Sequence, residues 1–147
     1  MAIAERSAQT VWEGPLASGA GVITGNSGAY GELPVTWASR TEAPGGKTSP
    51  EELAAAAHSS CFSMALSLRL GEHGLTPTRL SVTATVALDA VDGLPTVVSS
   101  DVDVRAVVPG ADVTTFQAAV DEAAALCPIS RLFAGAKIAV TAVLETA

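Results

Sequence analysis

The sequence predicts an α+β fold in which mainly antiparallel sheets surround one long central helix. Three observations support this prediction. Short β-prone runs separated by Gly and Pro occupy the start of the chain, a helix of about 21 residues follows from Pro50, and alternating strands with one further long helix complete the sequence. With 147 residues, of which 48% are hydrophobic, the chain is expected to form one domain that spans residues 1–147.

The opening segment is typical of a hairpin or meander. Residues 9–13 and 19–24 are short β-prone runs, and residues 34–39 form a third candidate strand. Residues 40–47 are rich in Gly, Pro and polar side chains, which predicts a loop, and Arg40 is expected to lie in it.

The central helix carries its own start and stop signals. Ser49 is placed to cap the first free amides, Pro50 suits the first helical position, and Glu52 occupies the capping-box position. Gly71 is placed to end the helix. Residues 53–68 contain no charged side chain and have small or apolar residues on every side, so we expect the helix to be buried rather than amphipathic. The uncharged run is too short for a membrane span.

The second half of the chain alternates between strand and helix patterns. In residues 80–89 and 96–108, apolar side chains recur at every second position, which predicts two long strands joined by a tight turn at Asp92–Gly93. The remaining elements are a helix from Asp112 or Thr114 to about Leu126, a short helix over 128–133 and a final strand over 138–144.

The composition argues against some classes of partner. The formal net charge is -7 and basic residues do not cluster, which argues against nucleic acid and anionic membranes, because both need a basic surface. The N-terminal residues lack the apolar core of a signal peptide, so a cytoplasmic location is expected. Thiols are kept reduced there, and we therefore expect Cys61 and Cys127 to be reactive groups rather than a structural disulfide.

A reactive thiol needs a positive neighbour, because a free thiol is mostly protonated at neutral pH and only the thiolate is a strong nucleophile. Arg40 is the candidate cation for Cys61, since a guanidinium keeps its charge in a low-dielectric site. Glu51, in the first turn of the central helix, could hold that guanidinium, whereas its neighbour Glu52 is better interpreted as a cap. Arg131 is an alternative cation.

The spacing of these residues constrains the site. Glu51 and Cys61 are ten residues apart, which is about 15 Å along a straight helix, so they cannot meet within one chain. Two copies of the helix packed antiparallel about a two-fold axis near Ala56 would place Glu51 of one chain level with Cys61 of the other. We therefore expect a homodimer with shared sites, and the alternative is a break near the start of the helix.

The second thiol and a histidine complete the set of candidate residues. Pro128 disfavours helical backbone at Cys127, which places this thiol at the N-terminal end of a short helix, where it would ionise easily and could attack an oxidised sulfur. Considered without Cys61, Cys127 would be interpreted as a half-buried structural thiol. His58 lies three residues before Cys61, a spacing that could bind a metal, but no pair of carboxylates lies nearby and no metal site is expected.

Three motifs resemble the OsmC/Ohr family of osmotically inducible and organic-hydroperoxide-resistance proteins. They are Thr48-Ser49-Pro50-Glu51-Glu52-Leu53, the block from Ala56 to Leu66 around Cys61, and Cys127-Pro128-Ile129-Ser130. The resemblance extends from Trp12 to the last strand. The OsmC branch is the better match, because residues 7–39 contain no Lys or Arg, whereas the Ohr branch has its Arg in the opening meander, and because His58 stands where Ohr members tend to carry Tyr.

The resemblance implies a thiol-dependent peroxidase that forms an intertwined α+β homodimer with two sites at the subunit interface. Cys61 would be oxidised by the hydroperoxide to a sulfenic acid and Cys127 would resolve it as a disulfide. Arg40 and Glu51 match the family's Arg and Glu. No metal or other cofactor is implied, but an external reductant is required, either a dithiol or a dihydrolipoyl protein.

Two questions stay open at this point. Phe62, Met64 and Phe133 could give the site an apolar lining that favours organic hydroperoxides over hydrogen peroxide, although packing in the core is their more ordinary role. A non-catalytic dimeric module that senses redox state or binds a small apolar ligand could also use the same thiols without turnover.

Overall fold

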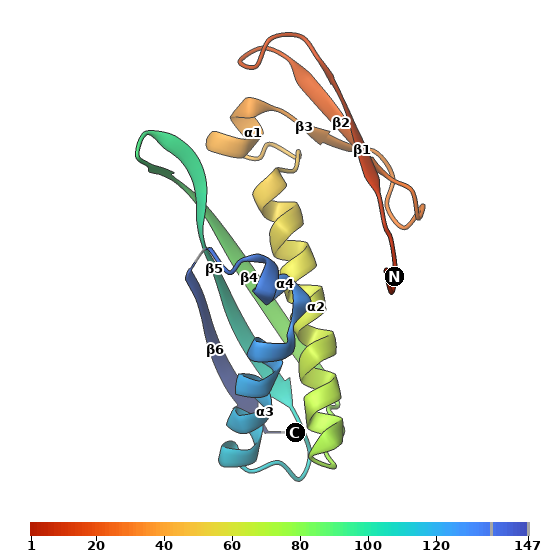
Figure 1. Cartoon of the computed structure of the whole chain (residues 1–147), viewed down its shortest axis with the longest axis vertical. Helices are drawn as coiled ribbons and strands as arrows, with labels where there is room; N and C mark the ends of the chain where they lie inside the picture. The colour runs from red at the N-terminus through yellow and green to blue at the C-terminus, as the bar shows by residue number, and fades with distance from the viewer. Residues whose placement is uncertain (136, 147) are drawn as a thin grey trace. The chain divides into compact units, whose positions relative to one another are not determined.

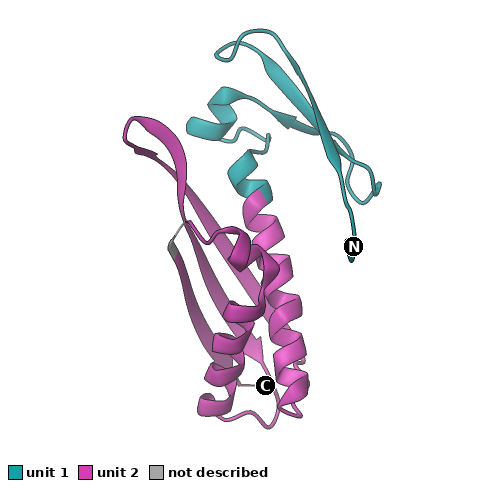
Figure 2. Ribbon diagram, viewed as in Figure 1, with its two compact units in different colours: residues 1–53 teal, residues 54–147 magenta. Residues whose placement is uncertain are grey.

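The computed structural model describes residues 1–135 and 137–146. The chain divides into two compact units, Met1–Leu53 and Ala54–Ala147 (Figure 2). Each unit contains one three-stranded sheet, and helix α2 (Pro50–Glu72) begins in the first unit and continues in the second. No helix of the described residues is long and apolar enough to cross a membrane.

The first unit is built on the antiparallel sheet β1-β2-β3, followed by the short helix α1 (Figure 1). The bounds of these elements are β1 Ala8–Glu13, β2 Ala20–Gly25, β3 Leu33–Val35 and α1 Trp37–Thr41. The predicted third strand is therefore wrong beyond Val35. Thr36 and Ser39 form a capping box, in which the Ser39 amide donates to Thr36 Oγ1 at 3.0 Å and the Thr36 amide donates to Ser39 Oγ at 2.9 Å. Arg40 lies in this helix and not in a loop.

Helix α2 starts as predicted, with one difference. The Glu52 amide donates to Ser49 Oγ at 3.1 Å, which confirms Ser49 as a cap. The Glu52 carboxylate, however, accepts a hydrogen bond from Thr48 Oγ1 at 2.5 Å instead of one from the Ser49 amide. Helix α2 is continuous from Pro50 to Glu72, so the alternative of a break near its start is wrong.

The end of α2 lies beyond the predicted position. Gly74 adopts a φ of 73°, which is a left-handed conformation that suits glycine. Its amide donates to the Gly71 carbonyl at 3.0 Å, and the Leu75 amide donates to the Leu70 carbonyl at 2.8 Å. This pair of bonds is the Schellman motif, so Gly74 ends the helix and Gly71 lies in its last turn.

The second unit is built on the sheet β4-β5-β6, with bounds Arg79–Val91, Leu94–Val107 and Lys137–Glu145. Strands β4 and β5 are antiparallel, as predicted, and β6 runs parallel to β5. Asp92 and Gly93 both have positive φ, at 52° and 79°. This is the geometry of a type I′ hairpin turn, and it confirms the tight turn expected there.

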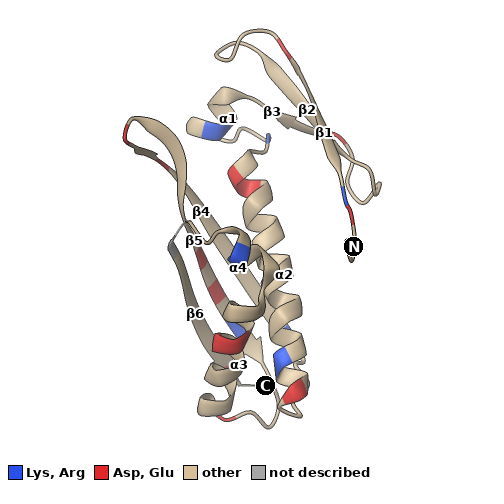
Figure 3. Cartoon of the chain, viewed as in Figure 1, with Lys and Arg blue, Asp and Glu red and all other residues tan. Residues whose placement is uncertain are grey.

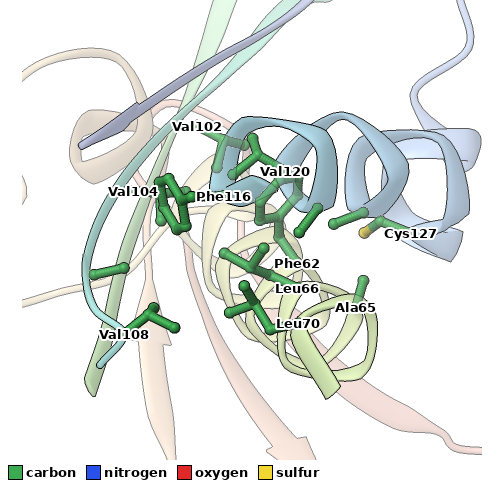
Figure 4. Packing of buried hydrophobic residues seen from close by; sticks show 13 residues of the cluster. Phe62, Ala65, Leu66, Leu70, Val102, Val104, Val108, Phe116, Val120 and Cys127 are labelled. Carbon is green, nitrogen blue, oxygen red and sulfur yellow. The ribbon is translucent and has the colours of Figure 1, made fainter. Parts of the chain in front are cut away.

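The core of the second unit lies between one face of this sheet and the helices α2 and α3 (Val113–Leu126), which lie over that face (Figure 1). Phe62, Leu66 and Leu70 of α2 point toward Val102 and Val104 of β5 and toward Phe116 and Val120 of α3 (Figure 4). The buried residues confirm the alternation predicted for β5 and the inner face predicted for α3, which Asp112 caps through the Thr115 amide at 2.8 Å.

The prediction that α2 is buried on all sides is wrong for the single chain. Met64 is 72% exposed and Leu68 is 53% exposed, and Ala57 and Ser60 are exposed on the same side of the helix. Figure 3 shows that the middle of α2 nevertheless carries no charge on any face. The helix therefore presents an uncharged, partly apolar face to its surroundings.

Candidate functional site

The four predicted catalytic residues form two pairs, one in each compact unit. Arg40 and Glu51 meet in the first unit, and Cys61 and Cys127 meet in the second.

Arg40 and Glu51 form a forked ion pair. Arg40 Nε lies 3.0 and 3.2 Å from the two carboxylate oxygens, and Arg40 Nη2 lies 2.7 Å from Oε1. The Ser39 hydroxyl donates to the Thr48 carbonyl at 3.0 Å, which ties α1 to the residues that precede α2. The guanidinium carbon also lies 5.9 Å from the centre of the Trp37 ring, within cation–π range. The guanidinium is thus fixed by a carboxylate and an aromatic ring.

Arg40 borders a cavity of about 200 Å³ that lies wholly within the first unit. The other lining residues come from the sheet, from the turn between β1 and β2, from α1 with its N-cap and from the start of α2. They are mostly apolar or aromatic: Thr10, Trp12, Leu16, Ile23, Val35, Thr36, Trp37 and Pro50. A mostly apolar wall with one fixed cation suits a small apolar molecule that carries a polar end.

Cys61 and Cys127 are brought into contact from distant parts of the sequence. Their Sγ atoms lie 3.2 Å apart, and both thiols are free. Cys61 is half-buried on α2, whereas Cys127 is fully buried between α3 and α4 (Pro128–Leu132). Its backbone angles, φ -54° and ψ 117°, are not helical, which confirms the break that Pro128 predicts.

The two thiols differ in acidity. Burial raises the pKa of Cys61, and this outweighs the opposing effect of the Ile129 amide. Burial also acts to raise the pKa of Cys127, but hydrogen bonding from the Ser130 hydroxyl and amide, from Cys61 and from the Ile129 amide outweighs it, so the pKa of Cys127 is lowered. Among the described residues of this unit, Cys127 is therefore the thiol that ionises more readily.

A buried histidine lies beside the thiol pair in the same unit. His58 is fully buried on α2; its Nδ1 lies 2.6 Å from Ser100 Oγ, and its Nε2 lies 2.8 Å from Ser130 Oγ. The ring centre of Phe133 lies 5.4 Å from that of the imidazole. Burial lowers the pKa of His58, so the ring is held neutral.

Ser100 and Ser130 were not singled out by the sequence analysis. Ser100 is fully buried because it shares the inward-facing parity of Val102 and Val104 on β5, and this parity is visible in the sequence. Ser130 belongs to the motif that begins at Cys127, but nothing in the sequence pairs it with His58.

The other candidate residues lie partly in the core and partly at the surface. Phe62 belongs to the core, Phe133 packs on His58, and Met64 is exposed, so core packing is confirmed for Phe62 and is wrong for Met64. Arg131 is exposed on α4. Within the described residues, no group of three or more His, Cys, Asp and Glu side chains could hold a metal ion.

Comparisons of this sequence with family models and with named proteins point to one protein family. The family model described as OsmC-like protein matches residues 43–142. A relative from Escherichia coli (strain K12), named peroxiredoxin OsmC, is 42% identical over 127 residues, which cover 86% of this chain and 88% of that protein.

Solved structures show the same fold. The organic hydroperoxide resistance protein OsmC of Legionella pneumophila has a TM-score of 0.73 at 23% identity, with 99% of each chain covered. The organic hydroperoxide resistance protein OhrB of Bacillus subtilis has a TM-score of 0.71 at 24% identity, with 95% of this chain and 98% of that chain covered. The predicted α+β fold is confirmed.

Proposed function

This chain belongs to the OsmC-like protein family, and from that premise we propose that it is a cysteine-based peroxidase that reduces organic hydroperoxides. The names of its relatives support a peroxidase-type redox role in oxidative stress. The observation that carries the finer proposal is the 3.2 Å contact between the sulfur atoms of two free thiols that are 66 residues apart in the sequence.

In the first step, the Cys61 thiolate attacks the distal oxygen of the hydroperoxide. An S–O bond forms, the O–O bond breaks, and the alkoxide leaves and takes up a proton to become an alcohol. Cys61 is left as a sulfenic acid. The half-buried position of Cys61 supports this assignment, because Cys127 is fully buried and less accessible to a hydroperoxide.

In the second step, Cys127 attacks the oxidised sulfur of Cys61. An S–S bond forms, the S–O bond breaks, and the oxygen leaves as water with the proton that Cys127 has released. The lowered pKa of Cys127 suits this nucleophile. The sulfur atoms, 3.2 Å apart when reduced, must approach by only about 1.2 Å to reach the bond length of a disulfide.

The cavity beside Arg40 supports a preference for organic hydroperoxides over hydrogen peroxide. Its mostly apolar walls would accept an alkyl or aryl group, while the guanidinium would stabilise the negative charge that develops on the peroxide oxygens. The ion pair with Glu51 would keep the guanidinium oriented for that purpose.

A homodimer would unite the two pairs. No Lys or Arg is among the described hydrogen-bonding partners of Cys61 and Cys127, and the pKa of Cys61 is raised, so this thiol needs a cation from elsewhere. In the proposed dimer, Arg40 and Glu51 of one subunit approach Cys61 of the other. The uncharged, exposed face of α2 is suited to such an interface.

No cofactor is proposed, but turnover requires a reductant. A dithiol or a dihydrolipoyl protein would reduce the Cys61–Cys127 disulfide by thiol–disulfide exchange and return both thiols.

A thiol titration tests the proposal. Reduced protein is mixed with cumene hydroperoxide or with hydrogen peroxide, and free thiols and intact mass are followed. We expect both thiols to be lost together, with a mass decrease of about two daltons per disulfide, reversal by a dithiol, and faster reaction with the organic peroxide. Cys61→Ser should abolish the reaction.

Two outcomes would contradict the proposal. A Cys61→Ser variant that still consumes hydroperoxide would overturn the assignment of the peroxidatic thiol. Thiols that stay reduced under excess hydroperoxide would leave the non-catalytic redox or ligand-binding module in its place.

A further inference from the structure

The buried histidine of the second unit is not used by the mechanism above, although it is linked to the thiols. His58 and Ser100 are fully buried, Ser130 is 6% exposed, and both ring nitrogens of His58 have a serine hydroxyl within 2.8 Å. Buried polar groups that satisfy one another in this way hold a defined geometry and are costly to disrupt.

Ser130 connects this network to Cys127. Cys127 is the N-cap residue of α4 and Ser130 is the third residue of that helix, so the two side chains lie on the same turn. Hydrogen bonding by Ser130 is one cause of the lowered pKa of Cys127, and Cys127 in turn contacts Cys61. The path from Ser100 through His58 to Ser130 therefore ends on the helical turn that carries Cys127, the partner of Cys61.

The number of hydrogens in the path limits its arrangements. A neutral imidazole carries one N–H, and each serine hydroxyl carries one O–H. If Nε2 carries the hydrogen, it donates to Ser130, Ser100 donates to Nδ1, and the Ser130 hydrogen is free to point at Cys127. If Nδ1 carries the hydrogen, it donates to Ser100, and Ser130 must donate to Nε2 instead of to the sulfur.

We propose that His58, Ser100 and Ser130 are positioning residues for the resolving thiol: the Nε2–H tautomer of His58, held by Ser100, directs the Ser130 hydroxyl to donate to the Cys127 thiolate. This inference rests on the proposed function, because it assigns the residues to the second step of that reaction. The network acts on disulfide formation and not on the attack of Cys61 on the peroxide.

The covalent step itself is unchanged by the network. Cys127 still forms the S–S bond, the S–O bond of Cys61 still breaks, and the thiol proton of Cys127 still leaves with the oxygen as water. The Ser130 hydroxyl only stabilises the negative sulfur before it attacks. The Nδ1–H tautomer, in which Ser130 donates to Nε2, is compatible with the finished disulfide, which needs no donor.

The test separates the two steps of the reaction. Reduced protein is mixed with one equivalent of cumene hydroperoxide, peroxide loss and disulfide formation are followed by stopped flow, and sulfenic acid is trapped with dimedone. For Ser130→Ala we expect peroxide loss at the native rate. Disulfide formation should be about tenfold slower, because one hydrogen bond to a charged group is lost. The Cys61 sulfenic acid should therefore accumulate and be trapped. Ser130→Thr, which keeps the hydroxyl, should restore the native rate.

A second readout does not need turnover. In a Cys61→Ser background, the ultraviolet absorbance of the Cys127 thiolate is titrated against pH. Ser130→Ala and His58→Phe should both move the titration midpoint upward, and the double variant should move it no further than either single change, because the residues act in one path. Ser100→Ala, a deletion of one oxygen, tests the far end of the path if His58→Phe does not fold.

The two readouts also separate this inference from the proposed function. If Ser130→Ala forms the disulfide at the native rate and leaves the thiolate titration unchanged, the inference is overturned while the peroxidase survives. If the native protein consumes no hydroperoxide, the peroxidase fails, and the thiolate titration alone decides whether the network acts on Cys127.

Discussion

Removal of the carboxylate that holds Arg40 gives the sharpest test of the ion pair. Both of the shorter contacts, from Nε at 3.0 Å and Nη2 at 2.7 Å, go to the same oxygen of Glu51, and only the 3.2 Å contact goes to the other. In Glu51→Gln, the amide oxygen can take the place of Oε1 and keep two hydrogen bonds from the guanidinium, while the third contact and the carboxylate charge are lost.

The magnitude follows from these contacts. The variant loses the attraction between the two opposite charges, and the Arg40 side chain is 29% exposed, so solvent screens part of the loss. We expect Glu51→Gln to cost about 1.4 kcal/mol of transition-state stabilisation, which is about tenfold in kcat/KM. Glu51→Ala removes every contact of the carboxylate with Arg40 and should lower kcat/KM about a hundredfold.

The assay is hydroperoxide consumption with a dithiol as reductant, at several cumene hydroperoxide concentrations. The neighbouring carboxylate supplies a matched control, because Glu52 is exposed and its carboxylate contacts only the Thr48 hydroxyl among the described contacts. Glu52→Gln should change kcat/KM less than about twofold. Native kcat/KM in Glu51→Ala, or an equal loss in Glu52→Gln, would refute the assignment of Glu51 as the residue that orients the guanidinium.

Three further predictions concern the second unit. Cys127→Ser should consume one equivalent of hydroperoxide per chain and then stall with Cys61 as a sulfenic acid, as measured by mass after dimedone trapping; continued turnover with a dithiol would exclude Cys127 as the obligatory resolving thiol. Gly74→Ala should lower the free energy of unfolding, measured by urea titration, by about 1 kcal/mol, because alanine is strained at positive φ. Gly71→Ala should raise the same free energy by about 0.5–1 kcal/mol, because Gly71 lies within the helix and an added Cβ would meet open space. Because burial lowers the pKa of His58, the unfolded chain binds a proton that the folded chain does not, so stability should fall as pH decreases below the ordinary histidine value of 6.5. His58→Gln should flatten that slope, and an unchanged slope in His58→Gln would contradict the neutral buried ring.

The elements that could be predicted from the sequence are those in which local pattern and tertiary packing agree. The alternation of residues 80–89 matches the pleat of β4, and Asp112 has the side chain that an N-cap needs. The region around Thr36 was mispredicted because Val35, Thr36 and Trp37 all favour strands, while the Thr36–Ser39 capping box, a weaker signal, decides the structure.

The candidate site was predictable only in part, for a related reason. The ion pair between Arg40 and Glu51 follows from chemical complementarity, and the structure brings the two residues together as the sequence analysis expected. The His58 network depends on Ser100 and Ser130, which reach the ring from a strand and a helix that are 42 and 72 residues away in the sequence. A serine carries no pattern that identifies its partner, so contacts of this kind become visible only in three dimensions.

The exposed face of α2 explains why the sequence predicted burial of the whole helix. A helix on the surface of a monomer usually presents charged side chains to solvent, yet residues 53–68 have none, and the face with Ala57, Ser60, Met64 and Leu68 is open in the single chain. The absence of charge therefore indicates burial that one chain does not provide. In the proposed dimer a second α2 would cover this face, and the small side chains of residues 54–57 would allow the two helices to approach closely. Close approach at that point is also what the shared site requires, because it sets how near Arg40 and Glu51 of one subunit come to Cys61 of the other.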